Sequence, residues 1–203
     1  MKNLVNYDIN EVHKYEINGI PLETGDLIFT IDGNPSPVIG QFWWIVGRLI
    51  PGDVDHIAIY IGPEGRCIEA GAVGKVIDFQ VPSKKWNADA MLKDRGFVDE
   101  FYGVAYPLSG SNLSDEKKQQ IRLDVAQYCL DQARDKKPYN LNFLDSDTEE
   151  AFYCSQLVYK AYIRHGINLN TEKEVPKIPF TKSIVFPQEV WATCKEKKPF
   201  FSM

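Results

Sequence analysis

The uneven distribution of strand-like and helical sequence along the chain is the feature that most constrains its fold. Up to about residue 108, segments rich in β-branched and aromatic residues alternate with glycine, proline and aspartate, and they predict strands at 25–31, 56–62, 66–71, 75–81 and 101–108. Beyond that point, apolar residues recur at helical spacing within 114–137 and 151–166. Strands followed by helices without regular alternation predict an α+β fold in which a bent antiparallel sheet packs against helices.

Composition limits the function classes that this fold can serve. A chain of 203 residues with 44% hydrophobic residues can bury a sizeable core, and we expect one domain over residues 1–203. The net charge of -5, with dispersed Lys and Arg, differs from the basic surface that nucleic acids require, so no nucleic-acid partner is expected. The first residues lack the apolar run of a signal peptide or membrane span, which predicts a cytoplasmic protein without an integral membrane segment.

The second predicted helix places a cysteine on its apolar face. That face is formed by Cys154, Leu157, Val158, Ala161 and His165. Gly166 is a C-terminal stop, and two capping patterns, Asp147 with Glu150 and Ser146 with Glu149, indicate the start of the helix. Cys154 is therefore expected in the first or second turn, facing the core.

The four cysteines of the chain lie far apart, with no close pair. They are expected to be free thiols without a metal site, a disulfide framework or a cofactor. Cys129 is predicted to lie in the core and Cys194 at the surface.

A nucleophilic cysteine needs a base within hydrogen-bond reach, and three histidines are available. His165 lies about three helical turns beyond Cys154 and cannot reach it along a continuous helix. His13 belongs to a polar N-terminal segment. His56, which opens the alternating segment HIAIYIG, is the remaining candidate and shares its strand face with Tyr60.

The turn after this strand determines which acidic residue can orient His56. A two- or four-residue loop at Gly62–Gly65 pairs Ile61 with Arg66, Tyr60 with Cys67 and Ala58 with Glu69. This register puts Glu69 diagonal to His56 on one face. A three- or five-residue loop would reverse one strand and destroy this arrangement. A non-catalytic alternative remains open. In it, His56 and Glu69 form a half-exposed cross-strand pair without a chemical role, and Cys154 is an unreactive residue of the core.

The stretch KKPYNLNFLDSDTEEAFYCSQLVYKAY resembles the nucleophile region of the NlpC superfamily of papain-like amidases. In that family a Pro-Tyr pair precedes a Cys-Ser at the head of a helix, and Pro138, Tyr139, Cys154 and Ser155 match those positions. The motif order GDLIF, DHIAIYIG, CIEA and FYCSQLVY resembles the circularly permuted YiiX and YaeF branch, whose distant relatives include the lecithin retinol acyltransferases. The resemblance covers about residues 25–165 and leaves 168–203 as a C-terminal extension.

The resemblance implies a permuted papain-like fold with Cys154 as nucleophile, His56 as base and Glu69 as the acceptor that orients the base. It also implies that the Tyr139 hydroxyl binds the substrate carbonyl beside the Cys154 backbone N–H, a role that rests on the resemblance alone. Tyr60 is a further expected substrate contact. Trp43, which is paired with Trp44, is expected to line the cleft, with burial in the core as the alternative.

These residues together predict a cysteine-dependent hydrolase that cleaves an amide bond of a small peptide or amino-acid conjugate through a thioester. One alternative keeps the chemistry but changes the substrate: a thiol acyltransferase or lipid hydrolase, with residues 42–45 contacting acyl chains. Another is a non-catalytic binding module in which Cys154 is unactivated.

Overall fold

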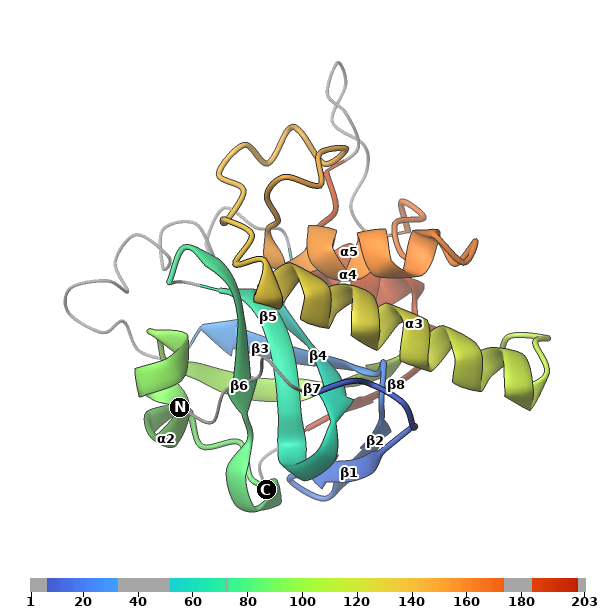
Figure 1. The fold of residues 1–203 in the computed structure, drawn as a ribbon, viewed down its shortest axis with the longest axis horizontal. Helices are drawn as coiled ribbons and strands as arrows, with labels where there is room; N and C mark the ends of the chain where they lie inside the picture. Colours follow the sequence, from blue (N-terminus) through green and yellow to red (C-terminus); the bar gives the residue numbers. More distant parts are fainter. Residues whose placement is uncertain (1–6, 33–51, 72, 174–183, 201–203) are drawn as a thin grey trace.

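The computed structural model describes residues 7–32, 52–71, 73–173 and 184–200. Its main element is a six-stranded sheet in which every pair of neighbours is antiparallel (Figure 1). In spatial order the strands are β6 (Lys75–Gln80), β5 (Arg66–Gly71), β4 (His56–Gly62), β3 (Leu27–Asp32), β7 (Asp99–Tyr106) and β8 (Glu196–Pro199). The five predicted strands all occur in this sheet, and the α+β fold class is confirmed.

The helices follow mostly after the strands, as predicted. They are α2 (Ala88–Arg95), α3 (Asp115–Arg134), α4 (Cys154–Ile163) and α5 (Pro187–Thr193), with short 3₁₀ turns η2 (Pro63–Gly65) and η3 (Pro82–Lys84). Ser114 caps α3 as expected, because its Oγ accepts a hydrogen bond from the Lys117 N–H at 3.2 Å.

The apolar face of β4 forms the base of the core beneath the long helices. Ile57 and Ile59 are completely buried against Val125 of α3 and Leu157 of α4. Figure 1 shows α3 and α4 lying next to each other beside the sheet. Alternate residues of β4, such as Ala58, belong to a second buried cluster that also contains residues of the hairpin formed by β1 (Lys14–Ile17) and β2 (Ile20–Glu23).

The β4–β5 turn reaches the expected register by an unexpected route. The loop is the three-residue turn η2, so Arg66 pairs with Gly62 and the predicted pair of Ile61 with Arg66 is wrong. Tyr60 still pairs with Cys67, because the register shifts between Tyr60 and Gly62. The extra residue, Ile61, forms a β-bulge that compensates for the odd loop length. The relative positions of the two strands beyond the bulge are therefore those predicted for an even loop.

Other parts of the structure differ from the sequence-based expectations. Helix α4 begins at Cys154, because residues 140–153 form an irregular segment instead of an earlier helical turn. Cys194 was predicted at the surface, but it is 3% exposed and packs in the core at the end of α5. Residues 184–200 supply α5 and the edge strand β8, and β8 pairs with β7 in the sheet.

Candidate active site

Cys154 is the first residue of α4. The residue before it, Tyr153, caps the helix, and the first hydrogen bond of the helix runs from the Leu157 N–H to the Tyr153 carbonyl at 3.0 Å. The N–H groups of residues 154–156 therefore precede the intrahelical hydrogen bonds, at the positively polarised end of the helix. Cys154 itself is 5% exposed, so its thiol lies in a shielded position beside this end.

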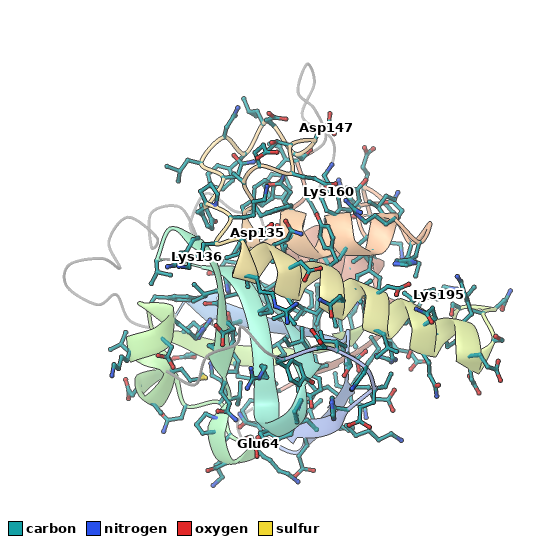
Figure 2. The ribbon with its side chains drawn as sticks, viewed as in Figure 1. Glu64, Asp135, Lys136, Asp147, Lys160 and Lys195 are labelled. Atoms are coloured by element: carbon teal, nitrogen blue, oxygen red, sulfur yellow. The ribbon has the colours of Figure 1, made fainter. Side chains whose placement is uncertain are left out.

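Polar side chains hold the irregular segment before α4 against the helix. The buried Gln156 side chain accepts hydrogen bonds from the Tyr153 N–H at 3.3 Å and from Asn140 Nδ2 at 3.0 Å, and donates to the Thr148 carbonyl at 2.9 Å. Farther along α4, Lys160 Nζ donates to the Asp147 carbonyl at 2.9 Å, and Figure 2 shows these two residues at the top of the molecule. The segment that precedes the thiol is thus fixed at several points.

The segment after residue 183 is also attached to the first turn of α4. Ser155 Oγ donates a hydrogen bond to the Val185 carbonyl at 2.7 Å, and the Val185 N–H donates to the Tyr153 hydroxyl at 3.1 Å. Ser155 of the Cys-Ser pair therefore makes a structural contact to the segment that precedes α5.

His56 lies at the start of β4, with its ring between the thiol and a buried carboxylate. Its Nε2 is 2.9 Å from Glu69 Oε2, and Cys154 is close enough to contribute to the raised pKa of the ring. Because Nε2 is engaged by Glu69, Nδ1 is the nitrogen left for the thiol. The ring is 13% exposed and meets Phe97 edge-on, with centroids 5.2 Å apart.

A glycine leaves the space in which Glu69 bends toward His56. A Cβ at Gly71 would lie 2.8 Å from Glu69 Oε1 and 3.3 Å from Glu69 Cγ. The two residues share one face of β5, so the glutamate side chain passes directly over the glycine. A larger residue at position 71 would displace the carboxylate.

The charges around His56 favour its protonated form. Burial alone would lower the pKa of His56, but the neighbouring Cys154 and Glu69 raise it well above its usual value. Burial would likewise raise the pKa of Glu69, but the Arg95 guanidinium and His56 hold it below the usual value. Glu69 is therefore an anion that faces an imidazolium.

Two charged residues of this region were missed in the sequence. Arg95, the last residue of α2, and Asp99, the first residue of β7, are both buried beside Glu69. Arg95 and Glu69 lie 26 positions apart, and helix α2 was not predicted, so no local pattern indicated their contact.

The other predicted site residues have different positions. Tyr139 is half-buried, forms an isolated bridge with Phe152, and lies close enough for Cys154 to contribute to the raised pKa of its hydroxyl, of which burial is the main cause. Tyr60 is completely buried and stacks on Tyr15 with centroids 5.8 Å apart, about four residues or 13 Å along β4 from His56. This position does not support the expected contact of Tyr60 with substrate. Trp43 lies outside the described residues.

The described residues offer neither a metal site nor a helix that could cross a membrane. Within these ranges, no cluster of three or more His, Cys, Asp or Glu side chains has an arrangement that could hold a metal ion. Among the helices that the structure describes, none combines the length and apolar character needed to cross a bilayer.

A cysteine at the head of a helix, beside a histidine on a strand that precedes it in the chain, defines the circularly permuted papain-like class. The family model described as permuted papain-like amidase enzyme, YaeF/YiiX, C92 family, matches residues 21–196, and the chain belongs to this family. The predicted resemblance to the permuted YiiX and YaeF branch is confirmed, and the general class is that of a cysteine hydrolase.

A solved structure has a similar fold. It is described as the crystal structure of metalloprotein YiiX from Escherichia coli O157:H7, and it superposes with a TM-score of 0.52 at 21% identity over 89% of this chain and 97% of that chain. Among curated proteins, none matches the sequence.

Proposed function

We propose that the protein is a cysteine amidase or peptidase of the NlpC superfamily that cleaves an amide bond of a small peptide or amino-acid conjugate. The observation that carries this proposal is the position of the His56 imidazole, hydrogen-bonded to Glu69 at 2.9 Å and close enough to Cys154 for the thiol to contribute to the raised pKa of the ring. A nucleophile, a base within reach and an acceptor that orients the base are the parts that acyl transfer to a thiol requires.

In the first half of the reaction, the Cys154 thiolate attacks the amide carbonyl carbon and the carbonyl electrons move to oxygen. The Cys154 N–H at the start of α4 donates a hydrogen bond to this oxyanion, and we assign the Tyr139 hydroxyl as a second donor. The His56 imidazolium then gives its Nδ1 proton to the leaving nitrogen. The C–N bond breaks, the amine leaves, and a thioester remains on Cys154.

In the second half, water replaces the amine. Neutral His56 takes a proton from water as the oxygen attacks the thioester carbonyl, and the C–S bond breaks when the tetrahedral intermediate collapses. The products are a carboxylic acid and the regenerated pair of thiolate and imidazolium. Glu69 stays ionised throughout and stabilises the imidazolium each time it forms.

The cellular location is part of the proposal. All four cysteines are free in the structure, including Cys154. Free thiols fit a reducing compartment, which supports the cytoplasm as the location. Fractionation of cells, followed by detection of the native protein, tests this part separately.

A second candidate is a thiol acyltransferase or lipid hydrolase, and one observation favours it. Leu141 and Leu144 are 64% and 53% exposed on the segment that precedes the nucleophile. Phe143, between them, packs edge-on near Tyr139 and contacts Tyr153, so the apolar side chains lie close to the start of α4. An acyl chain would gain contact area there.

The proposed function is tested with a panel of aminoacyl amides, dipeptides and N-acyl amino acids, followed by mass spectrometry of both products and enzyme. We expect hydrolysis, an acyl adduct on Cys154, and complete loss of both in Cys154→Ala. Cys67→Ala, a buried thiol on the strand of Glu69, is the matched control and should keep turnover. Turnover by Cys154→Ala equal to wild type would refute the mechanism, and an acylated acceptor in place of free acid would indicate acyl transfer.

A further inference from the structure

Arg95 contacts the carboxylate of Glu69 through two nitrogens. Nε is 3.1 Å from both Oε1 and Oε2, and Nη2 is 2.9 Å from Oε2, the oxygen that also faces His56 Nε2. Arg95 and Glu69 are both completely buried at their side chains. The carboxylate of Glu69 is therefore held by contacts to both the Arg95 guanidinium and the His56 imidazole.

The opposite side of the guanidinium is held by Asp99. Arg95 Nη1 donates to Asp99 Oδ1 at 2.5 Å and Nη2 donates to Oδ2 at 2.8 Å, so the two groups form a two-pronged ion pair. Trp86 Nε1 donates to Asp99 Oδ1 at 3.2 Å. The chain geometry brings the pair together, because Gly96 ends α2 in the left-handed region at φ 77° and β7 then begins at Asp99.

Aromatic rings surround the guanidinium and exclude water from it. Its central carbon lies 4.7 Å from the ring centroid of Phe79, 4.8 Å from that of Trp86 and 4.3 Å from that of Phe97. Phe97 also contacts the ring of His56, so one aromatic side chain bridges the cation and the imidazole.

The charges of this cluster balance only when His56 is protonated. Glu69 and Asp99 carry two negative charges and Arg95 one positive charge, so an imidazolium at His56 makes the buried group neutral. A structural ion pair alone is a weak explanation, because buried ion pairs are commonly replaced by apolar residues without loss of stability. The cluster contacts His56 through Glu69, and this contact indicates a role in maintaining the charge of the imidazole.

We propose that Arg95 is a positioning residue that keeps Glu69 ionised and aligned on His56, with Asp99 balancing its charge. The inference rests on the proposed function of the same site. Without the guanidinium, the buried Glu69 would accept a proton more readily, and the protonated form would no longer stabilise the imidazolium. The pair of thiolate and imidazolium would then form only at higher pH.

The titratable and charged groups around Glu69 and His56 come from several elements, and they determine which groups the pH profile of Cys154 alkylation can report. Those that interact with Glu69 or His56 are Cys154 of α4, Cys67 of β5, Arg95 of α2 and Tyr139 of the segment before α4. Cys67 and Tyr139 both have raised pKa values, mainly because of burial, so they stay neutral below pH 9. A change of the Cys154 alkylation rate between pH 4 and 9 therefore reports on Cys154 and on the cluster of His56, Glu69, Arg95 and Asp99.

The test is the rate of iodoacetamide alkylation of Cys154 from pH 4 to 9, assigned by mass spectrometry, in Arg95→Gln, Arg95→Lys and Asp99→Asn. The acidic limb is the part of the pH profile where the alkylation rate rises with pH. In Arg95→Gln we expect this limb to lie about one pH unit higher, which means a tenfold lower rate at a given pH on the limb. In Arg95→Lys, which keeps the charge, we expect the limb to return toward its wild-type position. Asp99→Asn should not move the limb upward, because Arg95 remains beside Glu69 and keeps its carboxylate ionised. Arg122→Gln is the matched control, since Arg122 forms a buried ion pair with Asp26 at 2.8 Å outside the site.

An unmoved limb in folded Arg95→Gln, or an equal movement in Arg122→Gln, would overturn the proposal. If Arg95→Gln fails to fold, Arg95→Lys provides the test. This variant should keep the acidic limb at its wild-type pH but lower the maximal rate of Cys154 alkylation about tenfold, because the two-pronged contact is lost. An unchanged maximal rate would overturn the assignment. If wild-type alkylation is itself independent of His56, the proposed function fails. If wild type depends on His56 but not on Arg95, only the role of Arg95 fails.

Discussion

Asp26 links the sheet to α3 through a buried carboxylate whose charge depends on pH. The residue is 1% exposed, its Oδ1 accepts a hydrogen bond from Arg122 Nη1 at 2.8 Å, and its Oδ2 accepts one from the Glu23 N–H at 2.7 Å. Burial raises the pKa of Asp26 from 3.8 to about 6, although Arg122 and the Glu23 N–H act in the opposite direction. Between these two pH values, the folded protein binds a proton that the unfolded chain has already released.

The sign of the effect on stability follows from that proton. Because the folded state binds more protons between pH 4 and 6, the contribution of Asp26 to the free energy of unfolding falls as pH rises through this window. A shift of about two pH units corresponds to about 3 kcal/mol. Asn cannot ionise, so the free energy of unfolding of wild type minus that of Asp26→Asn should fall by about 3 kcal/mol from pH 4 to 7.

Urea denaturation of both proteins at half-unit steps from pH 4 to 8 measures this difference. Asp115→Asn is the control, because the Asp115 side chain is 92% exposed and should leave the difference nearly flat. A flat difference for Asp26→Asn, or one that rises with pH, would refute the reasoning about the buried carboxylate.

Further predictions concern the site and its supports. Glu69→Gln should lower Cys154 alkylation near pH 6 less than His56→Ala does, because the imidazole remains; a larger loss in Glu69→Gln would contradict this order. Gly71→Ala should lower the rate of Cys154 alkylation, because a Cβ at this position would lie 2.8 Å from Glu69 Oε1. Gly74→Ala is the control: nothing lies within 4 Å of a Cβ at Gly74, so this variant should affect stability alone. Tyr139→Phe should lower kcat about tenfold or more with unchanged alkylation, and equal turnover would remove Tyr139 from the oxyanion site. Ser155→Ala should cost about 1–3 kcal/mol in urea denaturation by leaving the Val185 carbonyl unpaired, with the thiol still reactive.

Much of the sheet follows from local sequence patterns. The segments HIAIYIG and RCIEAG form β4 and β5 with the predicted bounds, because their alternating pattern and their Gly and Pro punctuation act over a few residues. The turn between them was not predictable in detail: Ile61 forms a bulge that depends on packing around the whole hairpin. The pairing of His56 with Glu69 was therefore correct although the loop has three residues.

The parts that escaped prediction depend on contacts between distant segments. Arg95 reaches Glu69 only because α2 ends at Gly96 and the chain reverses into β7. The start of α4 at Cys154 depends on Gln156 and its contacts to Asn140 and Thr148, which compete with an earlier helical turn. Sequence periodicity carries no information about such tertiary hydrogen bonds.

The most direct test of the account is the pH dependence of iodoacetamide alkylation at each cysteine in wild type and His56→Ala. Cys67, Cys129 and Cys194 are buried and provide internal references on the same chain. We expect Cys154 alone to react rapidly below pH 7, and we expect His56→Ala to lose this reactivity. Slow alkylation of Cys154 at that pH in wild type, or a rate that His56→Ala leaves unchanged, would show that the thiol is not activated and would favour the non-catalytic binding module.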